Sequence, residues 1–370
     1  MRVVIVGGGV LGASTALHLA RAGVDAVLVD AAHAGRATAA GAGIVCPWVS
    51  GADDGAFYRL YAAGARYYPE LVRLLGGCGE YDLGYARVGG LCVSDDAAEL
   101  DFIADYVRAR AAEAPEAGEV RRLSTTEARA LFPPLRAGLA GVLVSGGARV
   151  DGRRLTAALW RAAQGLGADL REGIAELAIS DEHGFGVRVA GETLTADAVV
   201  VAAGAWAPAL LRPVGIALPV APMRGQIVHL RLPGSDTAGW PVVLPQSAHY
   251  LLAFEDSRVV AGATRESGAG FDYRVTAAGQ AEVLQEALHV APGLAAATVI
   301  ETRVGFRPVS ADGLPSLGRV RGVDGLYVGN GLGAAGLTIG PLAGKLLAEL
   351  VLDREIAMDL RPFDPLRRVQ

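Results

Sequence analysis

The stretch Arg2-Val-Val-Ile-Val-Gly-Gly-Gly-Val-Leu-Gly12 decides the fold of this 370-residue chain. Its apolar run over Val3–Val6 predicts a buried strand, and the apolar spacing from Leu11 to Ala22 predicts a helix directly after the glycines. In a Gly-x-Gly-x-x-Gly turn, the first glycine makes the tight turn and the second lets the backbone approach a pyrophosphate. The third glycine packs the helix on the strand, so the motif predicts a dinucleotide site in an α/β sheet.

An acidic residue completes this motif. A second predicted strand, Ala26–Val29, ends at Asp30, whose carboxylate can accept hydrogen bonds from an adenosine ribose. Two distant segments favour FAD over NAD: the strand that ends at 202–204, and the glycine turn at 330–336, which begins another helix. A helix N-terminus there would stabilise the negative charge of a reduced flavin. The alternative for this second turn is an ordinary strand-to-helix connection.

The composition excludes several classes of protein. With 52% hydrophobic and 20% charged residues the chain is too apolar to be disordered, and a scattered net charge of −5 gives no nucleic-acid-binding surface. Three cysteines (Cys46, Cys78 and Cys92) and six histidines show neither metal-ligand spacing nor a disulfide framework, so no metal is predicted. The strand at the very start disfavours a signal peptide, and Gly325–Gly344 has too many glycines for a transmembrane helix. We therefore expect a cytoplasmic protein.

Further along the chain, the patterns predict a second domain that is interleaved with the first and built on an antiparallel sheet. The predicted elements are an aromatic-bearing helix over 57–68, a solvated helical cover over 95–135, a helix at 155–165, a strand at 168–171, a buried strand at 196–204, antiparallel segments over 226–264 with a turn at Asp256-Ser257, a strand at 325–328, and a helix at about 338–352.

Several segments together resemble the D-amino acid oxidase, glycine oxidase and sarcosine oxidase family of FAD enzymes, which includes bacterial D-amino acid dehydrogenases. They are residues 3–30, 37–43, 202–206, 222–226, 262–266, 305–308 with 312–315, and 336–341. The resemblance implies an α/β fold, in which a Rossmann-like FAD-binding domain of the glutathione-reductase type is interleaved with a substrate domain on a mostly antiparallel sheet with helices. We expect the FAD-binding domain at 1–48, 146–212 and 302–370, and the substrate-binding domain at 49–145 and 213–301.

The resemblance also implies where the cofactor binds. The loop 37–43 lies along FAD with Thr38 near the phosphates, and Ile174 and Ala175 lie near the adenine. The residues expected to bind FAD, without a covalent bond, are Gly7, Gly9, Val10, Leu11, Gly12, Asp30, Ala31, Ala37, Thr38, Gly41, Ala42, Gly43, Ile44, Ile174, Ala175, Ala203, Gly204, Trp206, Arg307, Asn330, Gly331, Leu332, Gly333, Ala334, Ala335, Gly336, Leu337 and Thr338.

Arg307 is the predicted anchor for a substrate carboxylate, because a planar guanidinium binds a carboxylate through two parallel hydrogen bonds. By resemblance, the Tyr250 hydroxyl contacts the same carboxylate, and Arg224 lies beside the flavin as a third catalytic residue. The substrate pocket is also expected to contain Trp48, Tyr58 and His249. For Trp48, Tyr58 and Tyr250, packing in a core is the alternative that the sequence leaves open.

The chain departs from the family around the flavin. The C-terminal turn of glycine oxidases has a histidine and an arginine where this chain has Leu332 and Ala334. Sarcosine oxidases use a lysine near flavin N5, whereas the one lysine here, Lys345, lies on the last predicted helix. The cysteine that attaches flavin in sarcosine oxidases has no counterpart near the C-terminal turn, so Cys46 is expected to be a small packed residue.

Together, these features predict an FAD-dependent enzyme that oxidises the C–N bond of a small amino acid, with a D-amino acid as the first expectation. Hydride would pass from Cα to flavin N5, and the imine would be hydrolysed to a keto acid. The alternatives are an oxidase or dehydrogenase of N-methyl or cyclic secondary amino acids and of sarcosine, glycine or proline, or a non-catalytic flavoprotein subunit of a larger complex. The acceptor (dioxygen, a quinone or another), the oligomeric state and peripheral attachment to the inner membrane are left open.

Overall fold

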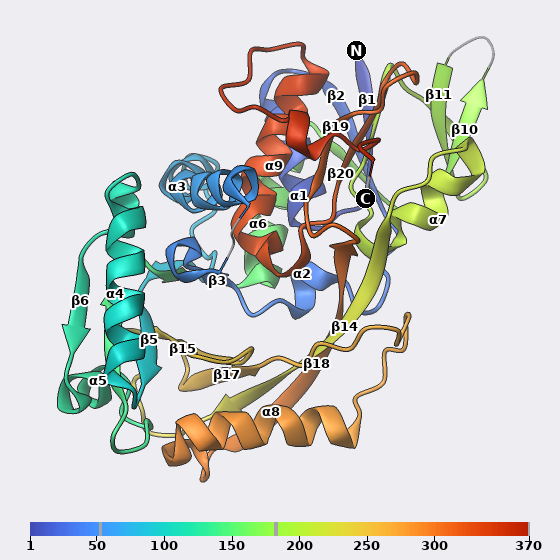
Figure 1. Ribbon diagram of the computed structural model, residues 1–370. Helices are drawn as coiled ribbons and strands as arrows, with labels where there is room; N and C mark the ends of the chain where they lie inside the picture. The colour runs from blue at the N-terminus through green and yellow to red at the C-terminus, as the bar shows by residue number, and fades with distance from the viewer. Residues whose placement is uncertain (52–53, 181–183, 369–370) are drawn as a thin grey trace.

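The computed structural model describes residues 1–51, 54–180 and 184–368, and its two largest sheets form separate layers (Figure 1). The first sheet has the strand order β19-β20-β13-β1-β2-β9 and is parallel except for the β19–β20 pair. Its strands are β1 (Arg2–Val6), β2 (Asp25–Asp30), β9 (Asp169–Glu172), β13 (Ala198–Val201), β19 (Ser316–Arg319) and β20 (Leu326–Asn330). The parallel strands end at one edge of the sheet, where ligands bind in open α/β sheets.

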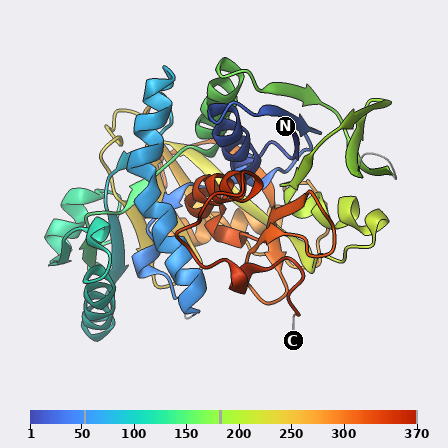
Figure 2. The same cartoon turned by 90° about the horizontal axis from the view of Figure 1, so that it is seen from above.

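Helices pack on one face of this sheet. Helix α1 (Val10–Arg21) begins directly after the glycine turn, as predicted, and lies between α6 (Gly152–Gly165) and α9 (Gly336–Val351). Helix α3 (Gly55–Gly77) lies against α9 (Figure 2). The opposite face of the sheet packs against a small sheet of β10 (Ala175–Ser180), β11 (Gly184–Val189) and β12 (Glu192–Thr195), and against α7 (Ala207–Leu211).

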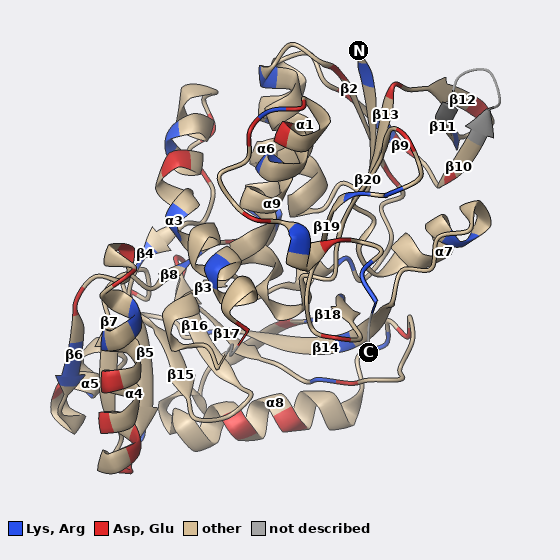
Figure 3. Ribbon diagram, turned by 45° about the horizontal axis from the view of Figure 1, so that its top comes forward, with Lys and Arg blue, Asp and Glu red and all other residues tan. Residues whose placement is uncertain are grey.

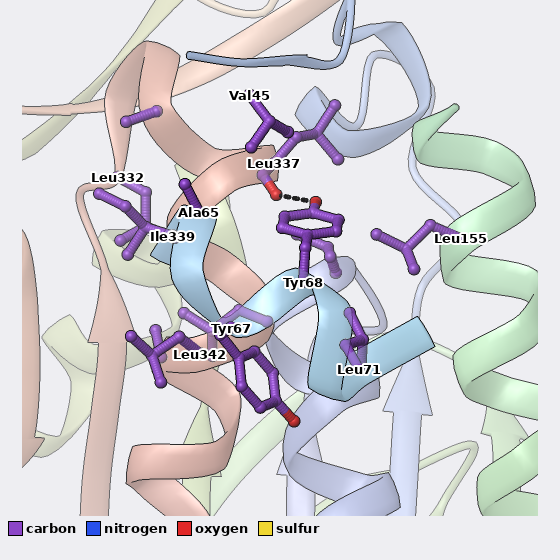
Figure 4. Packing of buried hydrophobic residues seen from close by; sticks show 14 of the residues in the cluster. Val45, Ala65, Tyr67, Tyr68, Leu71, Leu155, Leu332, Leu337, Ile339 and Leu342 are labelled. Atoms are coloured by element: carbon purple, nitrogen blue, oxygen red, sulfur yellow. Dashed lines mark hydrogen bonds between the residues drawn. The ribbon is translucent and has the colours of Figure 1, made fainter. Parts of the chain in front are cut away.

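The contact between α3 and α9 is close because of a glycine. A β-carbon at Gly64 would come within 2.5 Å of the Thr338 carbonyl oxygen, so only glycine lets the two helices approach here. One turn further along α3, the buried hydroxyl of Tyr68 donates a hydrogen bond to the carbonyl of Leu337 (Figure 4). Helix α3 therefore holds the first turn of α9 in place.

The second large sheet has the strand order β18-β14-β17-β16-β15-β5-β7-β6 and is antiparallel except for the β15–β5 pair. Its strands are β5 (Gly90–Ser94), β6 (Val120–Leu123), β7 (Ala140–Val144), β14 (Val220–Arg231), β15 (Val242–Pro245), β16 (Tyr250–Phe254), β17 (Arg258–Gly262) and β18 (Thr298–Ser310). Helix α8 (Ala277–Val290) packs on one face. The predicted turn at Asp256-Ser257 joins β16 to β17, and both residues have positive φ angles. The predicted α/β fold with a mostly antiparallel second sheet is confirmed.

Short elements complete the described structure: α2 (Ala37–Ala40), α4 (Ala97–Ala111), α5 (Thr125–Leu131), and a small sheet of β3 (Ile44–Val45), β8 (Ala148–Arg149) and β4 (Ala86–Arg87). The sequence predicts a helical cover over 95–135. In the structure this segment is only partly helical, because β6 lies between α4 and α5. Its sequence Val-Arg-Arg-Leu is too short to show strand alternation, and it forms the edge of the sheet.

The expected domain boundary at residue 302 lies inside strand β18. This strand pairs with β14 without a break at that residue, from Thr298 to Ser310. Both strands extend from the second sheet toward the first sheet and α7 (Figure 1). Near its end, β18 contacts the loop after β2: the Phe306 N–H donates to the Gly35 carbonyl over 2.9 Å. One strand thus belongs to both parts of the molecule.

One helical segment, Gly333–Val351, is long and apolar enough to cross a membrane by length and composition alone, but 72% of its most apolar window is buried inside the protein. It contains α9, which packs against α1 and α3. Its apolar character is therefore explained by packing within the fold.

Candidate active site

A cavity of about 1050 Å³ lies between the carboxyl ends of the first sheet and the second sheet. The ends of β1, β2, β13 and β20 line one side, and residues of β14, β16 and β18 line the other. Its volume slightly exceeds the usual range for ligand pockets, about 300–1,000 Å³. The cavity can therefore hold a long ligand together with a small one.

The glycine turn after β1 forms the nucleotide end of the cavity. Gly7 has a φ of 107°, and a β-carbon there would lie 2.4 Å from the carbonyl oxygen of Ala202. The N–H of Val10, the first residue of α1, donates to the Thr38 hydroxyl over 3.2 Å. Thr38 thus lies at the positive end of the α1 dipole, where backbone N–H groups bind phosphate. The turn fits a pyrophosphate.

The carboxylate of Asp30 is held in one orientation beside this turn. It accepts hydrogen bonds from the backbone N–H groups of Gly8 (2.6 Å) and Ala32 (2.7 Å) and from the guanidinium of Arg36 (2.8 Å). Asp30 is buried among protein atoms and still lines the cavity. A ribose hydroxyl would therefore meet a carboxylate that is already oriented.

Asn330 joins the two other glycine turns. Its side-chain N–H donates to the carbonyl of Gly204 over 2.9 Å, and its side-chain oxygen accepts from the N–H of Gly331 over 2.7 Å. Gly336 and Leu337, at the start of α9, line the cavity. The positive end of the α9 dipole therefore lies at the cavity wall, where it favours negative charge on a ligand.

Arg307 and Tyr250 meet at the other end of the cavity, and each lies over a glycine of another strand. A β-carbon at Gly225 would come within 2.4 Å of Arg307 Nη1, and one at Gly262 within 2.6 Å of the Tyr250 hydroxyl. The Arg307 guanidinium donates to the Thr264 carbonyl over 3.0 Å and forms a side-chain hydrogen bond with Tyr250. Burial raises the pKa of the Tyr250 phenol, and the guanidinium only partly opposes this. At neutral pH Tyr250 keeps its proton.

Comparison with known proteins identifies the family of this chain. The family model of the FAD dependent oxidoreductases (DAO) matches residues 2–350. The chain belongs to this family.

Several relatives match nearly the whole chain. Among curated proteins, the chain is 48% identical to the oxidoreductase YurR of Bacillus subtilis, over 98% of both chains. It is 33% identical to the glycine oxidase of Geobacillus kaustophilus, over 99% of this chain and 97% of that protein. The solved structure of iminodiacetate oxidase from Chelativorans sp. BNC1 has a TM-score of 0.96 and 54% identity, over 98% of this chain and 99% of that one. The structure of glycine oxidase from Geobacillus kaustophilus has a TM-score of 0.88 and 30% identity over both entire chains.

FAD is the cofactor of this DAO-family chain, and the three glycine turns, Asp30 and the two helix N-termini fit it. The predicted FAD-binding residues line the cavity, except for Gly12, Gly331, Ala335 and Thr338. Each of these four is a direct neighbour in the chain of a residue that does line it. Thr338 is buried and donates to the Ile44 carbonyl over 3.0 Å. Leu332 and Ala334, which replace the histidine and arginine expected from glycine oxidases, give the cavity an apolar wall there.

Arg265 is the main site residue that the sequence analysis does not single out. It lines the cavity, and its positive charge acts on both Tyr250 and Arg307. Strand alternation is the signal that could have found it, since residues 263 and 265 point to the same side of an extended segment. Tyr61 and Met223 also line the cavity without having been predicted.

Positive charge is in excess at the end of the cavity where Arg307 and Tyr250 meet. Among the described residues, Asp30 is the one acid that lines the cavity, and it is paired with Arg36. Among the residues that the structure describes, neither Arg265 nor Arg307 forms an ion pair with a carboxylate. The backbone group that Arg307 contacts is the neutral carbonyl of Thr264. Burial lowers the pKa of Arg307, but a guanidinium stays protonated in proteins. Two guanidinium groups without an acidic partner select an anionic ligand.

His249 lies in the cavity wall next to Tyr250, where the sequence analysis expects it. Its ring nitrogens are 3.3 Å from a carboxylate oxygen of Glu282 and 3.9 Å from one of Glu286. Both acids belong to α8, whose acidic residues are visible in Figure 3. The histidine therefore connects the cavity wall to a helix outside it.

The structure does not bring Trp48, Tyr58 or Arg224 into the cavity, contrary to expectation. Trp48 is buried in the core that surrounds α3 and α9, and the Tyr58 ring lies under the guanidinium of Arg110, 4.0 Å away. Arg224 lies between Met223 and Gly225, which do line the cavity, and successive side chains of a strand point to opposite faces.

Cys46, expected to be a packed residue, is buried but also borders the cavity. Burial raises the pKa of its thiol far above the ordinary value. A protonated thiol is a poor nucleophile, so this environment agrees with FAD that is bound without a covalent bond, which stays a prediction.

Proposed function

We propose that the chain oxidises the carbon–nitrogen bond of a small N-substituted amino acid, an amine with at least one carboxymethyl group. The observation that carries the proposal is the pair of guanidinium groups, Arg307 and Arg265, which have no acidic partner at the substrate end of the cavity. The similarity to iminodiacetate oxidase at 54% identity supports an N-substituted amine. Oxidation of a D-amino acid, which the sequence favours, stays a prediction, and so does the cytoplasmic location.

Arg307 and Tyr250 hold the substrate carboxylate in this proposal. The two parallel N–H groups of Arg307 bind its two oxygens, and the protonated Tyr250 hydroxyl donates to one of them. Arg265 adds a second positive charge, for the same carboxylate or for a second one. Because the carboxylate is fixed on three sides, its Cα has one orientation relative to the cofactor side of the cavity.

The reaction needs a two-electron acceptor, which FAD supplies when bound. A hydride leaves Cα and a proton leaves the nitrogen, so that the carbon–nitrogen single bond becomes an imine. Water then hydrolyses the imine to a 2-oxo acid and an amine. Tyr250 keeps its proton at neutral pH, so it orients the carboxylate while the amine enters in its neutral form. Orientation and electrostatics supply most of the catalysis.

An anaerobic titration of the purified FAD-loaded protein tests this function. Iminodiacetate, sarcosine, glycine and D-alanine are added in turn while the flavin absorbance is followed, and air is then admitted. We expect iminodiacetate and sarcosine, the N-substituted amines of this set, to bleach the flavin. The rate of reoxidation in air then shows whether dioxygen is the acceptor. Bleaching by D-alanine alone, or by no amine, would contradict the proposal.

The variant Arg307→Ala should raise KM for the same amines about 10- to 100-fold, because a hydrogen bond to a charged group contributes about 1.5–3 kcal/mol. The variant should still bind FAD. Arg319→Ala is the matched control, since Arg319 pairs with Asp353 on the surface.

A further inference from the structure

Arg224 lies outside the cavity, and its guanidinium holds two acids at once. Its side chain is 8% exposed. Its Nε is 3.0 Å from a carboxylate oxygen of Glu266, to which Nη2 also donates, and its Nη1 is 2.7 Å from a carboxylate oxygen of Asp272. The acids lie six residues apart in the sequence, so Arg224 closes the loop between them.

The second oxygen of the Glu266 carboxylate is bound as well. It accepts from the side-chain N–H of Gln226 over 2.8 Å and from the Thr264 hydroxyl over 2.7 Å. Gln226 in turn donates to the Thr276 hydroxyl over 2.9 Å. Glu266 is therefore bound by three side chains, which fix both its rotamer and its backbone.

The hydrogen bonds of Arg224, Gln226 and Glu266 adjoin the chain segment that carries Arg265 and contacts Arg307. The backbone of Glu266 exchanges two hydrogen bonds with Arg224, of 2.9 and 3.1 Å, and the Thr264 N–H donates to the Gln226 carbonyl over 3.2 Å. Arg265 lies between these two pairings and lines the cavity. The Thr264 carbonyl accepts from Arg307 over 3.0 Å. The segment 264–266 thus contacts one guanidinium and carries the other.

We propose that Arg224 is a positioning residue that sets the carboxylate-binding geometry of Arg265 and Arg307 through Glu266. The inference rests on the proposed function, because it assumes that these two arginines bind the substrate carboxylate. Buried ion pairs can often be replaced by apolar side chains with little loss of stability, so folding alone gives weak reason for this network. Its placement directly behind 264–266 gives it a role in orienting the cavity arginines.

The test compares Arg224→Met and Glu266→Gln with the wild-type holoenzyme. For both variants we expect KM for iminodiacetate to rise about tenfold or more, since small misplacements of positioning groups cost up to about 100-fold. The dissociation constant of acetate, measured by perturbation of the flavin absorbance, should rise in parallel. The kcat should fall by a smaller factor than KM rises, because a displaced carboxylate leaves Cα less well oriented for hydride transfer. Affinity for FAD should not change.

Two further variants separate positioning from general damage. Arg224→Lys should recover part of the affinity for acetate, because it keeps the charge but not the forked geometry. In an Arg265→Met background, Arg224→Met should raise KM by a smaller factor, since part of its effect passes through Arg265. Arg274→Ala is the control, because Arg274 is exposed and pairs with Asp272.

The outcomes distinguish this inference from the function on which it rests. If the wild type neither binds acetate nor is bleached by any carboxylate-bearing amine, the proposed function fails, and the inference fails with it. If the wild type does both and Arg224→Met equals it in KM and acetate affinity, only the inference is overturned. A parallel loss of FAD affinity and kcat in both Arg224→Met and Arg224→Lys would also overturn it, because that pattern indicates a general structural role.

Discussion

The hydroxyl of Tyr68 donates to the carbonyl of Leu337, which the helix itself cannot satisfy. In an α-helix this carbonyl would accept from the N–H four residues later, but that residue is Pro341, which has none. A side chain of α3 thus replaces the missing backbone hydrogen bond in the first turn of α9. This turn lines the cavity, so the partner helix stabilises part of the FAD site.

Tyr68→Phe should lower the free energy of unfolding by about 1–3 kcal/mol, because it leaves a buried carbonyl without a donor. Urea unfolding of the FAD-loaded protein measures this, with the exposed Tyr81→Phe as control. Adding Pro341→Ala should recover part of the loss, since residue 341 then has an N–H to donate. The explanation is wrong if the decrease in the free energy of unfolding of the double variant equals the sum of the decreases in the two single variants.

Gly225→Ala should impair substrate binding while the protein remains folded. The new β-carbon would lie 2.4 Å from Arg307 Nη1, and the guanidinium, at the end of a flexible side chain, can move away. We expect KM for carboxylate-bearing amines to rise about tenfold or more. Gly239→Ala, where no atom lies within 4 Å of the new β-carbon, is the control. Equal KM values for the two variants would show that the close packing of the Arg307 guanidinium on Gly225 does not matter for substrate binding.

Arg265→Met should raise KM for iminodiacetate about tenfold or more, because a charge-assisted contact to the carboxylate is lost. Affinity for FAD should not change. Steady-state kinetics and a flavin titration measure the two quantities, with the surface substitution Arg354→Met as control. A KM close to that of the wild type would remove Arg265 from the carboxylate site.

The stability of the fold should decrease in mild acid because of His229. This side chain is 2% exposed, and its ring nitrogens have no hydrogen-bond partner among the described residues. Burial lowers its pKa to about 3. Between pH 6.5 and 3 the unfolded chain binds a proton that the folded chain does not, so falling pH favours unfolding.

From pH 6.5 to pH 5, His229 should therefore lower the free energy of unfolding by about 1.5 kcal/mol. His18, whose pKa burial also lowers to about 3, adds a similar loss. Denaturant unfolding at the two pH values should show a smaller difference in His229→Leu than in the wild type. The exposed His289→Ala should behave as the wild type, and an unchanged pH dependence in His229→Leu would count against this assignment.

The sequence predicts the nucleotide end of the site better than the substrate end. Strand β1, the glycine turn and α1 depend on local apolar spacing and on backbone angles that only glycine adopts easily, so neighbouring residues suffice. The same holds for Asp30, at the end of the next strand. Asn330 could be assigned to the cavity because it begins a glycine turn, but its hydrogen bond to Gly204 joins segments 126 residues apart.

At the substrate end, side-chain direction decides the site, and the sequence does not supply it. Arg224 and Arg265 are on paired, adjacent segments, yet one points away from the cavity and the other lines it. Which of the two does so depends on the register of β14 against the residues after β17. Proximity along the chain places Trp48 and Tyr58 near the pocket, whereas Tyr61, nearly one turn beyond Tyr58, is the α3 residue that lines it.

Strand β18 limits how this enzyme can acquire new substrates. Arg307 directly follows Phe306, whose backbone is bonded to Gly35 in the loop after β2. A shift of β18 by one residue would turn the guanidinium out of the cavity, so the position of the proposed carboxylate anchor cannot change in small steps. Longer or shorter substrates must be accommodated by lining residues close to Arg307, in particular by Arg265 and the loop 246–248. Divergence among relatives should therefore concentrate there, while the anchor keeps its place.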